Sequence, residues 1–421
     1  MPLDVVLENL YARRRFGIRP GVDRVQILLE RLGHPERNYR SIHVVGTNGK
    51  GSTSAYLASI LSASGLRTAL FTSPHLVSFS ERFKINGSDI SPDRLEPLID
   101  SVLKAAPEEA TFFEIITALA TLYFSEEGVD VAVMEAGMGG RSDATAALDG
   151  AMTIVTPIAL DHCDYLGTTL EQIAAEKTGI AKPGTPVVIG HQSPEGTRAI
   201  SSCFSTNDTH LIWTDQSVSS TWNQDGTLNY QGLHTSLNNL RPGIPGRYQA
   251  QNASLALAAA EIFIQPTDDT LRNGILQARW PGRLETIPGP PTLLLDGAHN
   301  PAGAIALAEA LGDFHYRKLL LVLGVMSDKD VSQIVSALAP LTTTCYCVCP
   351  AVERAMDDKH LATTLMDLGL PATACGSVGN GITSAQRDAE NDDLILVCGS
   401  LFTVGEAKSW LAGKKFEGIR G

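Results

Sequence analysis

The sequence lacks any apolar run long enough to span a bilayer, and its first residues lack the pattern of a secretory signal peptide. The opening segment, MPLDVVLENLYARRRFG, has a short apolar part that acidic residues interrupt. Positive charge is also scarce, with 33 Lys and Arg against 46 Asp and Glu and a net charge of −13. This balance argues against a nucleic acid or a membrane surface as partner, and an anionic substrate would need a locally basic pocket. We expect a cytoplasmic protein.

Zinc-type cysteine spacing, internal repeats and low-complexity tracts are absent as well. Of seven cysteines, Cys345, Cys347 and Cys349 stand at alternate positions, which places them on one face of a strand. We interpret them as a packed strand face and not as a metal site. Hydrophobic residues at 43% and charged residues at 19% are typical of a globular protein, and 421 residues predict two or three domains.

Strand-like runs alternate with helical patterns along the chain, which predicts an α/β fold with largely parallel sheets. Several of these runs, such as VDVAVM and LLLVLG, are followed by short clusters of Gly, His, Asp, Glu or Lys. Open α/β sheets bind ligands at the carboxyl ends of their strands, so the clusters together predict a large site. For any single cluster, an ordinary polar turn is the alternative.

Two features suggest where the chain divides. Residues 193–245 are rich in Ser, Thr, Asn and Gln, and we expect them to form a peripheral β segment of the first domain. The Pro- and Gly-rich passage from Trp280 to Pro291 is typical of a hinge. The predicted domains are therefore residues 1–284 and 285–421.

The strongest local signal is HVVGTNGKGSTSAYLASIL, in which an apolar run enters a Gly-rich loop with one lysine and a helical pattern leaves it. This layout is typical of a phosphate-binding loop. The usual motif is G-x-x-x-x-G-K-[ST], whereas here Gly51 follows Lys50. We expect Lys50 to meet phosphate, the amides from Asn48 to Ser52 to surround it, and Ser52 to face Mg²⁺. A glycine turn with a solvated lysine is the alternative.

Glu135 ends an apolar strand and precedes the glycine-rich turn AGMGGRSD. A carboxylate at a strand end, opposite a phosphate loop, is well placed to hold Mg²⁺, and Arg141 and Asp143 could contact a ligand that approaches the glycines. Taken alone, Glu135 is equally consistent with a structural role.

Two further residues are ambiguous from the sequence alone. His162 follows Asp161 after the run MTIVTPIAL, and a single His is more often structural than functional. Lys177 lies on the apolar face of the helical pattern TTLEQIAAEKTG, where a buried charge would be costly. Composition favours a lysine that reaches solvent near the helix C-terminus.

In the second half, LLLDGAHNPAGAIALAEAL predicts a strand, a turn and a helix. Asn300 can cap this helix and Pro301 suits its first position, so Asp296 and His299 lie just before a helix N-terminus. That place suits an anion or ribose-phosphate contact, although polar turn residues are the alternative.

Taken in order, ten segments resemble the folylpolyglutamate synthase/dihydrofolate synthase family of the Mur ligase superfamily. They are GTNGKGST, TSPHL, ERF, EAGMGGRSDAT, IALDHCDYLG, AEKTGIAKPG, NASLALAA, PGRLE, DGAHNP and LVCGSLFTV. The resemblance covers nearly the whole chain from Gly46. It implies a P-loop ATPase domain with a peripheral β segment and a smaller, Rossmann-like C-terminal α/β domain. The motif G-T-N-G-K-G-[ST] is this superfamily's own phosphate loop.

The resemblance also implies roles for individual residues. The ATP contacts would be Asn48, Gly49, Lys50, Gly51, Ser52, Asn252, Arg283 and Asp296. The Mg²⁺ ligands would be Ser73, Glu135 and His162. The pteroate or folate contacts would be Phe113, Glu114, Arg141, Ser142 and Asp143. The glutamate contacts would be His299 and Ser400. Catalysis would fall to Lys50, Lys177 and His162, with Lys177 carbamylated.

The implied reaction joins L-glutamate to dihydropteroate and to folate γ-glutamyl tails, with ATP forming an acyl phosphate and Mg²⁺ as cofactor. Folylpolyglutamate synthesis alone and a silent nucleotide-binding regulator are alternatives. A Mur-type cell-wall enzyme fits poorly, because only 45 residues precede Gly46. Ala146 stands where the family often has Asn, which bears on substrate preference. We expect a monomer.

Overall fold

The computed structural model describes residues 3–13, 17, 19, 21–204, 209–414 and 416. Its N-terminal part is built on an eight-stranded sheet whose central strands are parallel and whose β2–β3 and β3–β4 pairs are antiparallel. In spatial order, the strands are β4 (Ser88–Asp89), β3 (Phe83–Ile85), β2 (Thr68–Phe71), β5 (Val131–Glu135), β1 (Arg40–Val45), β6 (Gly150–Val155), β7 (Val187–Ile189) and β8 (Leu211–Trp213).

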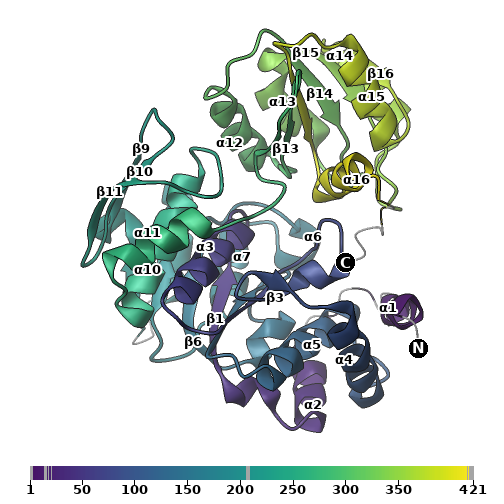
Figure 1. Ribbon diagram of the computed structural model, residues 1–421. Helices are drawn as coiled ribbons and strands as arrows, with labels where there is room; N and C mark the ends of the chain where they lie inside the picture. The colour runs from purple at the N-terminus through teal and green to yellow at the C-terminus, as the bar shows by residue number, and fades with distance from the viewer. Residues whose placement is uncertain are drawn as a thin grey trace.

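Helices cover both faces of this sheet (Figure 1), which is why β5 reads as a nearly continuous apolar run and why β1 is buried from Ser41 to Val45. One face packs against α3 (Lys50–Ala63), α10 (Gln249–Ile264) and α11 (Asp268–Gln277). The other packs against α1 (Leu3–Ala12), α2 (Asp23–Arg31), α4 (Pro92–Ala105), α5 (Phe112–Glu126), α7 (Leu170–Thr178) and α8 (Pro194–Cys203). Short helical turns join them, namely η2 (Pro35–Asn38), η3 (Phe79–Arg82), η4 (Ala144–Ala147), α6 (Cys163–Leu166) and α9 (Thr214–Ser217).

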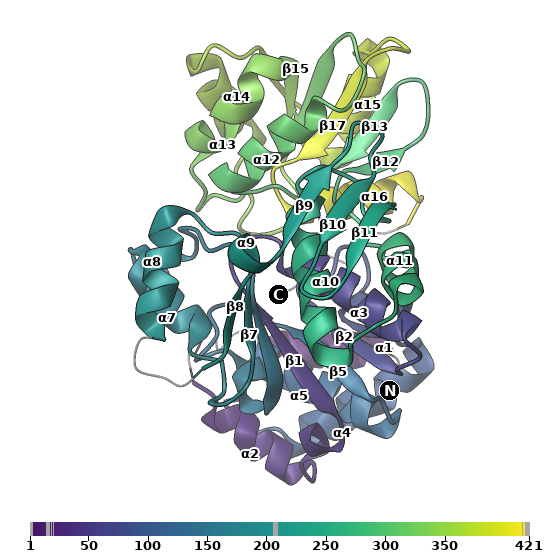
Figure 2. The same ribbon diagram turned by 90° about the vertical axis from the view of Figure 1, so that its left-hand side faces the viewer.

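A separate antiparallel sheet lies at the side of this domain, formed by β9 (Ser219–Trp222), β10 (Leu228–Gln231) and β11 (Ser236–Leu240) (Figure 2). The predicted peripheral β segment over 193–245 is therefore too long. Its first part forms α8, and β8 joins the edge of the large sheet. The apolar run of β8 pairs with β7 and so belongs to the main sheet.

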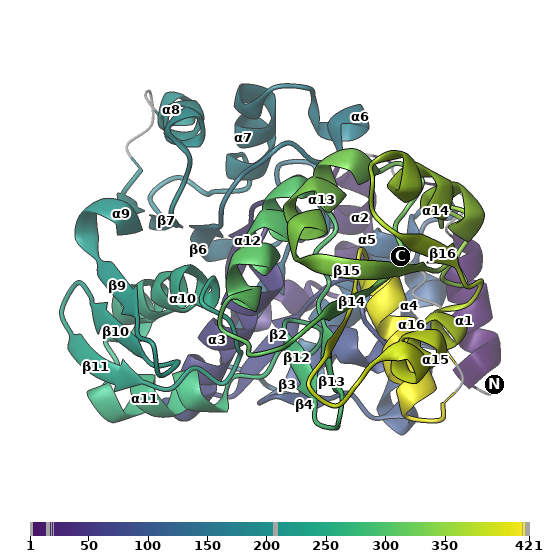
Figure 3. The ribbon, with the colours of Figure 1, turned by 90° about the horizontal axis from the view of Figure 1, so that it is seen from above.

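The C-terminal part has a six-stranded sheet that is parallel except for β12. Its strands, in spatial order, are β12 (Glu285–Ile287), β13 (Thr292–Leu295), β17 (Leu394–Cys398), β14 (Leu319–Leu323), β15 (Thr342–Cys347) and β16 (Ala372–Ala374). One face packs against α12 (Pro301–Leu311), α13 (Val331–Leu338) and α14 (Asp358–Asp367), and the other against α15 (Val378–Asp388) and α16 (Leu401–Leu411), with η5 (Ala339–Leu341) preceding β15 (Figure 3).

Two sequence interpretations change in this part. The expected hinge from Trp280 to Pro291 contains β12, because the first strand of the second sheet already begins at Glu285. Of the three alternating cysteines, Cys345 and Cys347 are buried in β15 with their sulfur atoms 4.0 Å apart, as expected for a packed strand face. Cys349 lies beyond the end of that strand.

The two α/β units meet through the loops that follow their parallel strands (Figure 1). The loop after β1 contacts the start of α12, and the loop after β6 contacts the loop after β14. The carboxyl ends of both sheets are therefore brought to one interface, where α/β proteins bind ligands. Among the residues that the structure describes, none belongs to a helix of the length and apolarity needed to cross a bilayer.

Candidate functional site

The Gly-rich loop joins β1 to α3, as predicted. Gly46 and Gly49 have φ angles of 141° and 85°, in the left-handed region that glycine adopts readily. A Cβ atom on Gly46 would lie 1.9 Å from Thr156 Oγ1, and one on Gly49 would lie 2.3 Å from Asn252 Oδ1. Both backbone angle and close packing therefore exclude side chains at these two positions.

Lys50 is the first residue of α3 and folds back over the loop. Its Nζ atom lies 3.2 Å from the carbonyl oxygens of both Gly46 and Thr47, so it is not the solvated lysine of the alternative interpretation. The next residue, Gly51, has no room for a side chain, because a Cβ atom there would lie 2.5 Å from the indole of Trp280. The unusual loop sequence thus accommodates a tryptophan from the connection between the domains.

The first turn of α3 is supported by α10. Gln249 Nε2 donates to Ser52 Oγ at 3.3 Å, and Asn252 Nδ2 donates to Gln249 Oε1 at 2.8 Å. Thr53 Oγ1 lies 3.5 Å from Asn252 Oδ1. The fold therefore brings together Ser52 and Asn252, which the sequence analysis assigned to one nucleotide site across about two hundred residues. Gln249, which was not predicted, links them.

Lys177 is buried, and the prediction that it reaches solvent is wrong. Only 3% of the residue is exposed, and its Nζ donates to the carbonyl of Gly46 at 2.8 Å. Burial lowers the pKa of Lys177 to about 7, and the nearby charge of Lys50 acts in the same direction. A buried amine with so low a pKa lies directly beside the phosphate loop.

Glu135 is the last residue of β5 and is also buried. Its carboxylate accepts a hydrogen bond of 3.3 Å from the backbone N–H of Ser73. Burial raises the pKa of Glu135 to about 7, against the opposing effects of Lys50, the Ser73 amide and two arginines, Arg283 and Arg82. The strand end thus presents a carboxylate whose charge the protein does not fully compensate.

His162 directly precedes α6 and has a φ of 53°, a left-handed conformation that is uncommon outside glycine. Its backbone N–H donates to Asp161 Oδ1 at 3.0 Å, and its Nε2 lies 3.9 Å from Asp161 Oδ2. The preceding strand ends at Val155, earlier than the run MTIVTPIAL suggested. Burial lowers the pKa of His162, opposed by Asp161 and reinforced by the charges of Lys50 and other nearby lysines.

The residues predicted in the C-terminal domain are held by local hydrogen bonds. The Asp296 carboxylate accepts from Tyr248 Oη and from the amides of Leu284 and Ala298, each at 2.9 Å. Ser400 caps α16 by accepting from the Thr403 amide at 3.0 Å. In this structure, both side chains therefore accept hydrogen bonds from backbone amides.

The turn before α12 has the predicted form. Asn300 caps the helix by accepting from the Gly303 amide at 2.8 Å, and Pro301 is its first residue. His299 Nδ1 lies 2.8 Å from Gly297 O, and burial lowers its pKa to about 4. The imidazole is therefore neutral at pH 7, donates from Nδ1 and leaves Nε2 as an acceptor.

Two polar contacts join the domains at the phosphate loop. Asn300 Nδ2 donates to Asn48 Oδ1 at 2.9 Å, and Lys329 Nζ donates to Asp161 Oδ1 at 2.9 Å. The charges of Lys50, Lys177 and Lys329 all act on His162. A protein with a net charge of −13 thus has a locally basic region at this interface.

The residues assigned to the pteroate lie on α5 and in the turn after β5. Phe113 packs near that turn, since a Cβ on Gly137 would meet its ring at 2.5 Å. Glu114 accepts from the Thr111 amide at 2.7 Å in a capping box and forms an ion pair with Arg24 at 2.8 Å. The Glu114 carboxylate therefore stabilises the start of α5.

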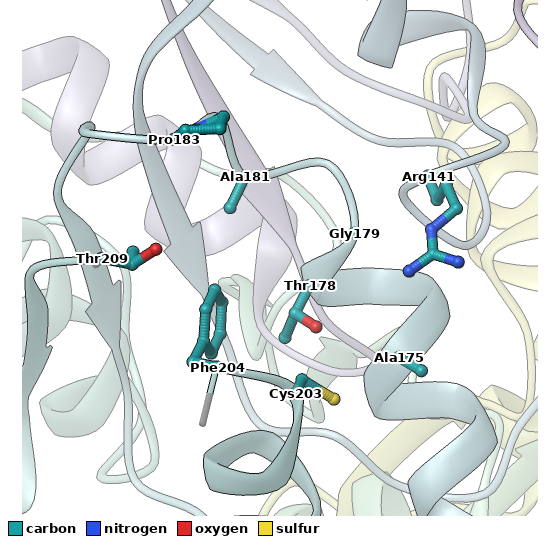
Figure 4. Close-up of a pocket in the computed structure, with 9 residues that line it drawn as sticks. All are labelled: Arg141, Ala175, Thr178, Gly179, Ala181, Pro183, Cys203, Phe204 and Thr209. Atoms are coloured by element: carbon teal, nitrogen blue, oxygen red, sulfur yellow. The ribbon is translucent and has the colours of Figure 1, made fainter. Parts of the chain in front are cut away.

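The turn after β5 is also held by hydrogen bonds between side chains and backbone amides. Asp143 accepts from the amides of Met138 and Thr145 at 3.0 and 2.9 Å, and the Ser142 amide donates to the Glu176 carboxylate at 2.9 Å. The Arg141 side chain borders a cavity of about 240 Å³ (Figure 4). Its lining residues are Arg141, Ala175, Thr178, Gly179, Ala181, Pro183, Cys203, Phe204 and Thr209. This small cavity is separate from the phosphate loop.

Comparison with known proteins agrees with this geometry. The model of the Mur ligase middle domain matches residues 44–260, and that of the Mur ligase glutamate ligase domain matches residues 282–401. A Bacillus subtilis protein named dihydrofolate synthase/folylpolyglutamate synthase is 32% identical over 96% of this chain and 97% of its own length. The chain belongs to this family of Mur ligases.

Solved structures of the family superpose closely on this one. Escherichia coli FolC in complex with DHPP and ADP has a TM-score of 0.91 at 30% identity, with 98% of each chain covered. A bifunctional folylpolyglutamate synthase/dihydrofolate synthase with Mn, AMPPNP and L-glutamate bound has a TM-score of 0.88 at 31% identity, again covering 98% of each chain. The chain spans about half the length of two archaeal curated relatives that it also matches, at 52% and 49% of their lengths.

The donor set at the interface fits a divalent cation bound together with a nucleotide. Ser73, Glu135 and His162 would supply a hydroxyl, a carboxylate and an imidazole. The described residues contain no cluster of three or more His, Cys, Asp or Glu side chains that could enclose a metal. Mg²⁺ suits such an open set, because it usually keeps waters and takes substrate phosphate oxygens as ligands.

Some residues that contact the candidate site residues or their neighbours were not predicted. Gln249, Tyr248 and Lys329 lie against Ser52, Asp296 and Asp161, yet nothing in their local sequence marks them. Asp161 was noted only as the neighbour of His162. Ala146 lies within η4, and its carbonyl oxygen is 3.4 Å from Lys182 Nζ.

Proposed function

We propose that this chain is an ATP-dependent ligase that adds L-glutamate to dihydropteroate, giving dihydrofolate, and to folate γ-glutamyl tails. The observation that supports it most is the meeting of two strand-end clusters at one interface. The phosphate loop with Lys50, Lys177 and Glu135 faces the turn with His299 in the second domain. Among the solved structures of relatives, one contains DHPP and ADP and another contains Mn, AMPPNP and L-glutamate.

The acceptor carboxylate first attacks the γ-phosphorus of ATP, giving an acyl phosphate and ADP. The glutamate amine then attacks the acyl carbon and loses a proton, and phosphate leaves as the amide forms. Lys50 would stabilise charge on the transferred phosphoryl group, with the loop amides from Asn48 to Ser52 around the phosphates. Asn252, Arg283 and Asp296 would position the rest of the nucleotide.

Ser73, Glu135 and His162 would hold Mg²⁺, which when bound neutralises phosphate charge during the transfer. Glu135 would bind in its carboxylate form, and its raised pKa makes this binding depend on pH near neutrality. The charge of Lys50 acts on both Glu135 and His162, which supports a common site for metal and phosphate.

Lys177 would act as its carbamate. The neutral amine attacks the carbon of CO₂ from solution and releases a proton, which converts a cation into an anion. The lowered pKa of Lys177 supplies neutral amine at pH 7, and the neighbouring Lys50 favours the anionic product. A ¹³C NMR carbamate signal in labelled bicarbonate, absent from Lys177→Met, would test this step.

On the acceptor side, Phe113 and the turn with Arg141, Ser142 and Asp143 would bind the pteroate. Glu114, whose carboxylate caps the start of α5, would belong to the same pteroate site. His299 would accept a hydrogen bond from the incoming amine at Nε2, and Ser400 would orient glutamate from the start of α16.

Phosphate release by the purified protein tests the reaction directly. ATP, Mg²⁺ and L-glutamate are supplied with dihydropteroate, with tetrahydrofolate or with neither, and product masses are measured. We expect release with both acceptors, with Lys50→Met as the inactive control. Release with tetrahydrofolate alone would limit the enzyme to tail extension, and ATP binding without release would indicate a nucleotide-binding regulator.

We also propose a division into domains at residues 1–284 and 285–421, since β12 begins at Glu285. We propose a monomer as well, because a two-domain hinge needs no partner. A cytoplasmic location follows from the use of ATP and reduced folates.

A further inference from the structure

Lys329 lies in the loop between β14 and α13 but contacts the other domain. Its Nζ is 2.9 Å from Asp161 Oδ1, and the exposed fractions of the two side chains are only 15% and 11%. The lysine extends from an anchored loop, because its amide donates to Met326 O at 3.1 Å and Met326 forms a β-bridge with Ala355. The C-terminal domain therefore holds a defined carboxylate of the N-terminal domain.

That carboxylate also contacts His162, whose side chain is 46% exposed. Asp161 Oδ1 accepts from the His162 amide at 3.0 Å, and Asp161 Oδ2 lies 3.9 Å from the imidazole Nε2. A left-handed φ of 53° is unfavourable for a residue with a Cβ, so it persists only where its surroundings impose it. Asp161 supplies one such constraint and α6, whose first backbone bonds go to His162 O, supplies another.

Because Lys329 is already paired with Asp161, a role only as a contact to the nucleotide does not account for its position. Its ammonium already has a largely buried carboxylate partner in Asp161 at 2.9 Å and a second, exposed one in Asp328 at 3.6 Å. Asp161 contacts both Lys329 and the metal-ligand candidate His162. The arrangement is a chain of contacts from one domain to the metal site of the other.

We infer that Lys329 is a positioning residue through which the C-terminal domain sets the metal–nucleotide affinity of the N-terminal domain. By holding Asp161, it keeps His162 in the conformation that binds the metal. This inference rests on the proposed function, since it takes His162 as a metal ligand.

Nucleotide titrations with and without Mn²⁺ test the inference in the full-length protein. We expect Lys329→Met to weaken Mn²⁺–ADP binding roughly fivefold, as for loss of one partly buried ion pair, and to leave metal-free ADP binding unchanged. Lys329→Arg should restore most of the affinity. Lys359→Met, which removes an exposed lysine of the same domain, is the matched control.

A double-mutant cycle tests whether Lys329 acts through Asp161. Asp161→Asn should weaken Mn²⁺–ADP binding as well, and adding Lys329→Met to it should have little further effect. Equal losses with and without Mn²⁺ would overturn the inference, because Lys329 would then contact the nucleotide itself. Unchanged Mn²⁺ dependence in Lys329→Met would also overturn it, even if the melting temperature fell. Wild-type protein that binds no Mn²⁺–ADP would refute the proposed function instead.

Discussion

The strand ends of the two domains meet at one interface but differ in how their polar groups are satisfied. On the N-terminal side, Lys177 and Glu135 are buried, and their pKa values are shifted in the direction that favours the uncharged form of each side chain. On the C-terminal side, Asp296, Asn300 and Ser400 are occupied by helix caps and backbone amides. Burial of the first set is electrostatically unfavourable, and a bound ligand of suitable charge can offset this. The second set is held in place by its hydrogen bonds. Reaction chemistry is thus expected from the first set and positioning from the second.

Replacement of Lys177 should produce the largest effect. Lys177→Met should lower kcat by about 10²–10³-fold, in the range for loss of one preorganised charged group. With CO₂ excluded, so that Lys177 is the free amine and not its carbamate, the same change should stabilise the protein by about 1–3 kcal/mol at pH 7, because burial of the ammonium is costly. Phosphate release and urea unfolding measure the two quantities.

The pH dependence of that stabilisation has a definite sign. The pKa of Lys177 falls from 10.5 to about 7 on folding, so the folded state binds fewer protons between these values. Wild-type stability should therefore rise with pH across this window, and the advantage of Lys177→Met should disappear towards pH 10.5. A variant that is less stable than wild type at every pH would contradict the account.

Glu135→Gln should have the next largest effect. Mn²⁺-dependent ADP affinity should fall at least tenfold, because the proposed metal ligand is lost. The pKa of Glu135 rises from 4.5 to about 7 on folding, so its desolvation cost appears as the pH rises through this range. The metal-free variant should therefore exceed wild type in stability by about 1–3 kcal/mol above pH 7 and match it below pH 4.5. Calorimetry in chelator measures this difference.

A cap on the C-terminal side should have a smaller and different effect. Asn300→Ala should cost about 1 kcal/mol of stability through loss of the α12 cap. It should also weaken ADP binding about twofold, as the contact with Asn48 is lost. Thr267→Ala removes the exposed cap of α11 and is the matched control, which should lose stability without a change in ADP affinity. Equal ADP affinities in both variants would show that the Asn48 contact is immaterial.

The smallest effect is expected at Ala146. Ala146→Asn should shift the ratio of kcat/KM for dihydropteroate and tetrahydrofolate by about threefold, within the range of one added polar contact. Steady-state kinetics with the two acceptors measure the ratio. A parallel change with both acceptors would remove Ala146 from the determinants of substrate choice.

The sequence predicted those features whose causes are local. The Gly loop, the helix that follows it and the Asn300–Pro301 start of α12 were all correct, because each depends on neighbouring residues. The hydroxyl of Thr111 and the carboxylate of Glu114 form a capping box that is legible as T-x-x-E, yet the family resemblance drew attention to a ligand role.

Features that depend on distant residues were missed. Helical periodicity placed Lys177 on an apolar face but could not show that the carbonyl of Gly46, 131 residues away, would accept its hydrogen bond. The same limit applies to Gln249 and Lys329, whose partners belong to other elements of the fold. Their roles follow from tertiary packing and not from local spacing.

The contact between Gly51 and Trp280 has a practical consequence. An indole against the first turn of α3, next to the phosphate loop, is a fluorophore whose emission depends on its surroundings. Of the four tryptophans, Trp213 and Trp222 lie on β8 and β9 and Trp410 lies on α16. Substitution of these three by Phe would leave an unlabelled protein with one optical probe at the loop, suited to stopped-flow measurement of nucleotide arrival.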